Sequence, residues 1–197
     1  FDQPGAKTNP RMIGRGSAVW NWYSVNTIIQ YNQATSIRGI LDSHGIHVDH
    51  HNENTFIQYN YMEDCEGGFV EILGDNETAV YRFNISVNDG WRENPNWVNS
   101  NHTIWLSNTI GGEAGHESNN SFIYNNTVVV NRSSNPYRTA IDIRANNTRI
   151  FNNIFYSING SKIGGKQVRV EDDNLLVTNN LFLSLIHISE PTRPSSI

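Results

Sequence analysis

The stretch from Gly45 to Gly90 contains the same unit twice, and this repetition constrains the fold more than any other feature. In the first copy, two alternating apolar–polar runs flank a polar turn, and the second run ends at Asn60. The second copy has the same order and ends at Asn84, 24 residues later. A fixed period of this size, made of short strands and polar turns, is typical of a solenoid.

The unit recurs through most of the chain. From one repeat to the next, the final asparagines are 28, 24, 41, 27 and 27 residues apart, and the longest interval fits an enlarged loop. The six residues are Asn32, Asn60, Asn84, Asn125, Asn152 and Asn179. A side-chain amide both donates and accepts, so asparagines stacked one coil apart are expected to form a ladder along the axis.

These features predict an all-β chain folded as a right-handed parallel β-helix of about six coils, truncated at both ends. Each coil is too short to bury its own apolar side, but stacked coils bury a continuous core. A β-sandwich with asparagine-rich loops is the alternative, and six repeats with matching flanks disfavour it. Residues 1–16 are predicted to be a loop or an incomplete coil, and residues 17–182 the β-helix.

With its alternating strands and corner asparagines, the segment 17–182 resembles the right-handed parallel β-helix repeat proteins of the pectin-lyase-like superfamily. The resemblance implies a carbohydrate-active protein, such as a polysaccharide lyase, a glycoside hydrolase or an epimerase. It also implies an extracellular or cell-surface location.

Residues 183–197 break the repeat abruptly. Their sequence, LSLIHISEPTRPSSI, resembles the conceptual translation of a transposase-derived sequencing adapter. We therefore expect a non-native tail that takes no part in the fold. A genuine C-terminal cap is the alternative.

The composition excludes several partners. The formal net charge is −5 and the basic residues are dispersed, which disfavours nucleic acid and an anionic membrane surface. No apolar run is long enough to cross a bilayer. The single cysteine, Cys65, forms no intramolecular disulfide and is predicted to be buried. We expect a monomer whose partner is a polysaccharide substrate.

Aligning the coils on their final asparagines predicts which residues of the first strand point outward. Side chains alternate along a strand and adjacent coils lie about 4.8 Å apart, so His47, Asp49 and Glu71 should cluster. The predicted outward column is Val19, His47, Glu71, Trp105, Asp142 and Arg169, beside a second column of Asn21, Asp49, Leu73, Ser107, Arg144 and Glu171.

This cluster predicts a saccharide site. Asp49 and Glu71 are the expected catalytic acid and base, because glycoside hydrolysis uses two carboxylates. His47 is expected to tune them by donating or accepting a proton. The alternative is that these charges only keep a wet face soluble.

Five other residues are predicted to bind substrate. Trp105 offers a flat face for a sugar, and Arg144, beside Asp142, can bind a uronate carboxylate in bidentate fashion. Trp91 and Arg92 lie in an irregular segment, residues 89–97, that is expected to form a loop along a groove. A second such loop is expected at residues 111–116.

No metal or other cofactor is predicted. Acidic corner residues leave Ca²⁺ as an alternative. The four histidines near residue 47 suggest a transition metal, but His47 should face opposite His44 and His50 if the strand persists. The acidic residues are Glu63, Asp64, Glu66 and Asp75, and the histidines are His44, His47, His50 and His51.

The reaction type stays open between three alternatives. A lyase needs a strong base, and lysine is absent from the central coils, which favours a hydrolase. Hydrolysis needs carboxylates about 5–5.5 Å apart for retention or about 6.5–9.5 Å apart for inversion. A lyase acting on a uronate polymer, or a non-catalytic carbohydrate-binding or structural β-helix, are the alternatives.

Overall fold

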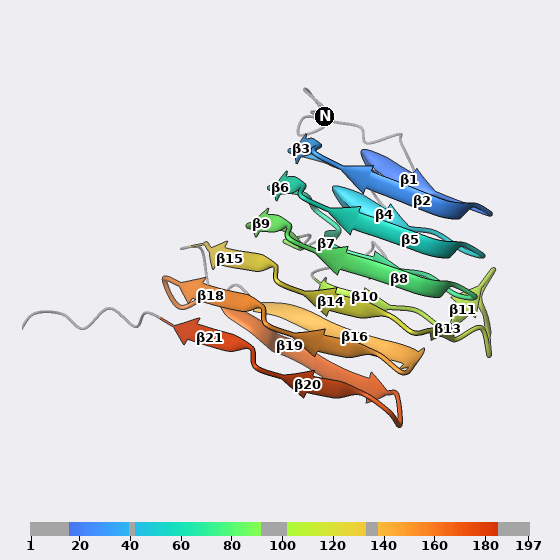
Figure 1. Cartoon of the computed structure of the whole chain (residues 1–197). Helices are drawn as coiled ribbons and strands as arrows, with labels where there is room; N and C mark the ends of the chain where they lie inside the picture. The colour runs from blue at the N-terminus through green and yellow to red at the C-terminus, as the bar shows by residue number, and fades with distance from the viewer. Residues whose placement is uncertain (1–15, 40–41, 92–101, 133–137, 185–197) are drawn as a thin grey trace, which may run out of the picture.

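The computed structural model describes residues 16–39, 42–91, 102–132 and 138–184. In these residues every element is a β-strand, and the strands stack in parallel as a β-solenoid of about five turns (Figure 1). The predicted all-β class and the parallel β-helix are confirmed. Within the same ranges there is no helix of the length and apolarity needed to span a bilayer.

The solenoid has three faces. The first face consists of β1 (Val19–Asn21), β4 (Ile46–Val48), β7 (Gly68–Ile72), β10 (His102–Leu106), β16 (Arg138–Asn146) and β19 (Lys162–Glu171). The second consists of β2 (Val25–Gln30), β5 (Glu53–Gln58), β8 (Glu77–Arg82), β13 (Ser118–Asn119), β14 (Phe122–Tyr124), β17 (Arg149–Phe151) and β20 (Leu176–Thr178). The third consists of β3 (Gln33–Thr35), β6 (Tyr61–Glu63), β9 (Ile85–Val87), β15 (Thr127–Asn131), β18 (Ile154–Ile158) and β21 (Leu181–Ser184).

One hairpin interrupts the stack. Strands β11 (Thr109–Ile110) and β12 (Glu113–Ala114) pair antiparallel around an exposed turn at Gly111 and Gly112. This hairpin is the second predicted loop, at residues 111–116. Of the first predicted loop, at residues 89–97, only Asp89 to Trp91 belong to the described residues.

The predicted register of the first coil is wrong by one residue. Val19 pairs with Ile46 and Trp20 with His47, so Trp20 takes the outward position predicted for Val19. The corner after β1 is one residue shorter than the corner after β4. Asn21 pairs with Val48 and Val25 with Glu53, so three residues (22–24) form the first corner and four (49–52) form the second. A slip of one residue exchanges the two sides of a strand.

The asparagine ladder exists, but three of its six predicted members are wrong by one. Its members are Asn32, Asn60, Asn84, Asn126, Asn153 and Asn180. The predicted Asn125, Asn152 and Asn179 precede the ladder positions and adopt positive φ, as Tyr31, Tyr59 and Phe83 do in the earlier turns. Asparagine tolerates this left-handed conformation better than most residues, so two successive asparagines stand at these corners.

The core lies between the three faces, and it contains a buried carboxyl group next to Cys65. Cys65 is fully buried, as predicted. Its backbone N–H donates to Asp89 Oδ1 at 2.8 Å, and Ser86 Oγ donates to Asp89 Oδ2 at 2.6 Å. Burial raises the pKa of Asp89 to about 7 against these hydrogen bonds, so the native state holds a proton that the unfolded chain has released.

We therefore expect the free energy of unfolding to fall as the pH rises from about 4 to about 7. In this window the unfolded Asp89 is ionised while the native one retains its proton, and above it both are ionised. The contribution is at most about 1.4 kcal/mol per pH unit. Urea unfolding of the wild type and of Asp89→Asn across this range tests it. Equal slopes for the two proteins would contradict the prediction.

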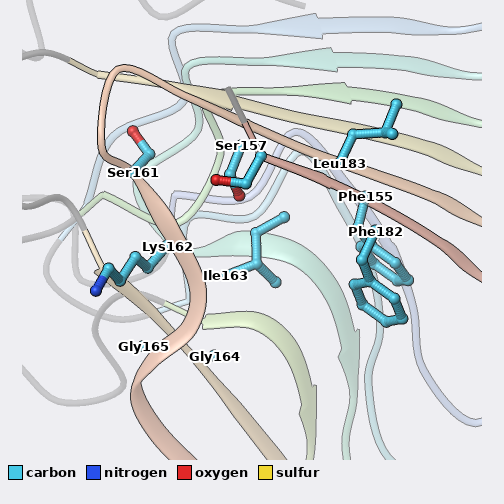
Figure 2. A pocket seen from close by; sticks show the side chains of 10 residues that line it. Phe155, Ser157, Ser161, Lys162, Ile163, Gly164, Gly165, Phe182 and Leu183 are labelled. Atoms are coloured by element: carbon cyan, nitrogen blue, oxygen red, sulfur yellow. The ribbon is translucent and has the colours of Figure 1, made fainter. Parts of the chain in front are cut away.

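In the last turn of the described residues, several apolar side chains are exposed. Val168 and Phe182 are each 64% exposed, whereas Phe155, one turn earlier, is 4% exposed and stacks on Phe182 at 5.1 Å between ring centroids. Figure 2 shows these two rings at the edge of a pocket of about 390 Å³, with Ile163 beside them and Lys162 pointing away. This pocket lies among β18, the start of β19 and β21, at the end of the described stack.

The predicted boundary of the β-helix at residue 182 remains a prediction. Strand β21 continues two residues beyond it, because Leu183 pairs with Tyr156 and Ser184 with Ser157. The rest of the predicted tail, residues 185–197, lies outside the described residues.

Candidate functional site

The outward column of the first face follows from the observed pairing. In order along the axis it reads Trp20, His47, Glu71, Trp105, Asp142 and Arg169. Four of its members are nearly inaccessible, with exposed fractions of 2% for His47, 0% for Glu71, 6% for Trp105 and 8% for Asp142. The prediction that this face is exposed to solvent is therefore wrong at these positions. Alternation identifies which side chains point outward, but it does not show whether other residues cover them.

Glu71, on β7, is the buried anion of the cluster. Its Oε2 lies 2.6 Å from His44 Nδ1 and 3.2 Å from His47 Nδ1. Burial raises the pKa of the Glu71 carboxyl, but the two histidines lower it by more, so the net pKa lies below the usual value. The predicted opposite orientation of His44 and His47 is wrong, because β4 begins only at Ile46 and strand alternation does not reach His44.

His47, on β4, lies between two carboxylates. Besides Glu71, it has Asp49 Oδ2 at 3.8 Å from Nε2, and Ser17 Oγ at 2.8 Å from Nδ1. Burial lowers the pKa of His47, but Glu71, Asp49 and Asp42 raise it by more, so the net pKa lies above 6.5. The ring also stacks on Trp20, with 6.0 Å between centroids and an 18° angle between planes.

Asp49 is the member of the predicted trio that reaches the surface. Its side chain is 13% exposed, and the His50 backbone N–H donates to its Oδ1 at 2.8 Å. Burial raises the pKa of Asp49, but the contacts with His47 and with His50 lower it by more. The carboxylate is therefore ionised at neutral pH.

A small pocket of about 40 Å³ opens at this cluster. Its lining consists of Ser17, Trp20, Asp42, His47 and Asp49. Glu71 does not line it, so the two acidic residues at the pocket are Asp42 and Asp49 rather than the predicted Asp49 and Glu71. Trp20 borders the pocket and is 51% exposed, which leaves an aromatic surface beside the carboxylates.

The predicted substrate-binding residues lie elsewhere. Trp105 packs between the rings of His44 and His102, with centroids 6.5 and 5.5 Å away. Arg144 Nε lies 3.2 Å from Asp142 Oδ1, and Arg144 Nη1 donates to Asn108 Oδ1 at 3.1 Å.

Trp91 is also occupied by the protein itself. The guanidinium groups of Arg38 and Arg132 lie 4.7 and 4.6 Å from its ring centroid, and both arginines pair with Asp64. Arg92 lies outside the described residues.

The acidic corner residues all bind groups of this chain. Asp64 pairs with the two arginines, and Asp75 contacts His51 and His116. Glu66 accepts from the Gly39 N–H, and Glu63 accepts from the Tyr61 hydroxyl. Among residues 16–39, 42–91, 102–132 and 138–184, no three His, Cys, Asp or Glu side chains are arranged to hold a metal ion.

Sequence reasoning missed four members of the cluster. Trp20 was assigned to the wrong side of its strand, and Ser17 carries no recognisable motif. Asp42 and His44 belong to the segment that enters β4, and the run of aspartates and histidines from residue 42 to 51 is the signal that could have identified them. Their positions depend on how an irregular corner folds over the first face.

Comparisons with protein-family models, with curated proteins and with solved structures found no match to this chain.

Proposed function

We propose that this chain is a carbohydrate-active β-helix protein of the pectin-lyase-like type that hydrolyses a polysaccharide at the pocket between Trp20, Asp42 and Asp49. The observation that supports it is that two aspartates line one small pocket bordered by a half-exposed tryptophan. Glycoside hydrolysis uses a carboxyl pair, and an aromatic face stacks on the C–H surface of a sugar.

The environment of Asp49 suggests its role, and the other role in the pair falls to Asp42. Asp49 is held ionised by His47 and by the His50 N–H, which suits a nucleophile or a general base. Asp42 then donates a proton to the glycosidic oxygen while the C–O bond breaks. Water supplies the hydroxyl of the new reducing end, and the proton that this water loses passes to the carboxylate that acts as the base.

His47 lines the pocket, and Glu71 lies behind it. His47 contacts Asp49 on one side and Glu71 on the other, so Glu71 is a positioning residue that keeps His47 charged and oriented. This assignment replaces the predicted acid–base pair of Asp49 and Glu71 with a pair of Asp42 and Asp49.

Hydrolysis suits this site better than β-elimination does. Elimination needs a strong base, and the lowered pKa of Asp49 makes it a weak one. The lysines of the described residues, Lys162 and Lys166, both lie on β19 in the last turn. A polysaccharide substrate also agrees with an extracellular or cell-surface location.

The test is an assay of the wild-type protein on a panel of neutral and uronate polysaccharides. We expect new reducing ends without a rise in absorbance near 235 nm, which marks the unsaturated product of elimination. New reducing ends together with that absorbance would show that the protein is a lyase and not a hydrolase. Absence of both signals on a panel to which the protein binds would leave a binding module.

A further inference from the structure

Two exposed aromatic side chains follow the pocket along the chain. Trp22 is 60% exposed and Tyr23 is 64% exposed, and their rings meet edge to face with 5.0 Å between centroids. The Tyr23 ring lies 4.4 Å from the ring of His51 in the next turn. Exposed aromatic side chains that gather in one place commonly mark a binding surface.

Polar groups continue this surface along the axis. His51, Asp75 and His116 stand at the same corner in successive turns, because the His51 N–H donates to Gly74 O and the Asp75 N–H donates to His116 O. Asp75 Oδ2 lies 3.5 Å from His51 Nδ1 and 2.9 Å from His116 Nδ1. Each of the three side chains is about a third exposed, at 30%, 32% and 33%.

We propose that this corner is a second polysaccharide-binding subsite, which we name the corner ridge: Trp22, Tyr23, His51, Asp75 and His116. The aromatic rings offer faces to sugar C–H groups, and the carboxylate and imidazoles offer hydrogen bonds to sugar hydroxyls. This inference rests on the proposed function, since the ligand is a further stretch of the same polysaccharide.

The ridge is continuous with the pocket. Trp22 directly follows the strand that holds Trp20, and Tyr23 N–H donates to His50 O. His50 Nε2 in turn lies 3.6 Å from Asp49 Oδ1. A chain bound at Asp49 therefore meets the ridge within one corner of the solenoid.

A second row of exposed aromatic residues is not continuous with the pocket. Tyr31, Tyr59 and Phe83 stack face to face at another corner, with interplanar angles of 12° and 8°. Each ring stacks on the ring of a neighbouring turn, and the row lies at a different corner from the pocket, so these residues suit stabilisation of the fold rather than sugar binding. Tyr31, 74% exposed, supplies a matched control.

Affinity electrophoresis through gels containing the polysaccharide tests the ridge independently of turnover. The variants are Trp22→Ala and Tyr23→Ala, with Tyr31→Ala as the control, each checked for wild-type circular dichroism. We expect each ridge variant to lose about fivefold in affinity, and KM to rise by a similar factor with little change in kcat. Tyr31→Ala should match the wild type.

The outcomes separate the two proposals. Ridge-dependent retardation without any turnover would support the ridge and overturn the hydrolase. Turnover with unchanged affinity in Trp22→Ala and Tyr23→Ala would overturn the ridge and leave the hydrolase. Absence of retardation for the wild type in every gel would overturn the ridge. The turnover assay alone would then decide whether the protein is a hydrolase.

Discussion

Replacing Asp49 with asparagine is expected to lower kcat on the polysaccharide by a factor of about 10² to 10⁴. The change removes the ionised carboxylate that lines the pocket but keeps the shape of the side chain and an acceptor for the His50 N–H. Asp42→Asn should reduce kcat similarly, because the other carboxyl group of the pair is lost. Steady-state rates from reducing-end release measure both effects.

The control for this experiment is Glu53→Gln. Glu53 is an exposed carboxylate on β5, in the same turn as Asp49, and it does not line the pocket. Its variant should retain wild-type turnover. An Asp49→Asn protein with wild-type thermal stability and undiminished turnover would remove Asp49 from the mechanism.

Replacing Asn84 with alanine is expected to destabilise the fold by about 2–5 kcal/mol. Asn84 Oδ1 accepts from the Asn60 backbone N–H at 3.0 Å, and Asn84 Nδ2 donates to Ile57 O at 2.9 Å. Its side chain is also bonded to Asn126 Oδ1, at 3.0 Å. The substitution leaves a backbone donor and a backbone acceptor unpaired in the middle of the stack, where water cannot replace the lost partner.

Asn32→Ala provides the matched control at the first position of the ladder. Asn32 Nδ2 donates to the exposed Gln30 O and to Asn60 Oδ1, and no partner of its Oδ1 is seen in the described residues. Its loss should cost about 1 kcal/mol or less. Urea unfolding compares the two proteins. Equal destabilisation would mean that the interior ladder bonds add no more than those at the end.

The repeat alone was enough to predict the parallel β-helix, because spacing and alternation are properties of the sequence. Two details were beyond that reasoning. Where two asparagines stand together, as at Asn125 and Asn126, composition does not say which is the ladder member. Where a corner loses one residue, as after Asn21, the side of the strand cannot be read from alignment with the next coil.

The candidate site was also only partly predictable from the repeat pattern. Alternation correctly grouped His47 and Glu71 on one side of their strands. It could not predict that His44 would lie against Glu71, or that Asp42 would line the pocket with Asp49. These contacts depend on the path of the irregular segment before β4, which has no periodic pattern.

The 42-residue interval between Asn84 and Asn126 has a consequence for how such a protein diversifies. The two side chains are hydrogen-bonded at 3.0 Å, like neighbours separated by 24 or 27 residues. Extra chain in that turn therefore leaves the stacking distance of the ladder unchanged. Loop length and coil stacking can vary independently, so insertions at a corner can alter what the surface recognises while the stacked strands stay the same.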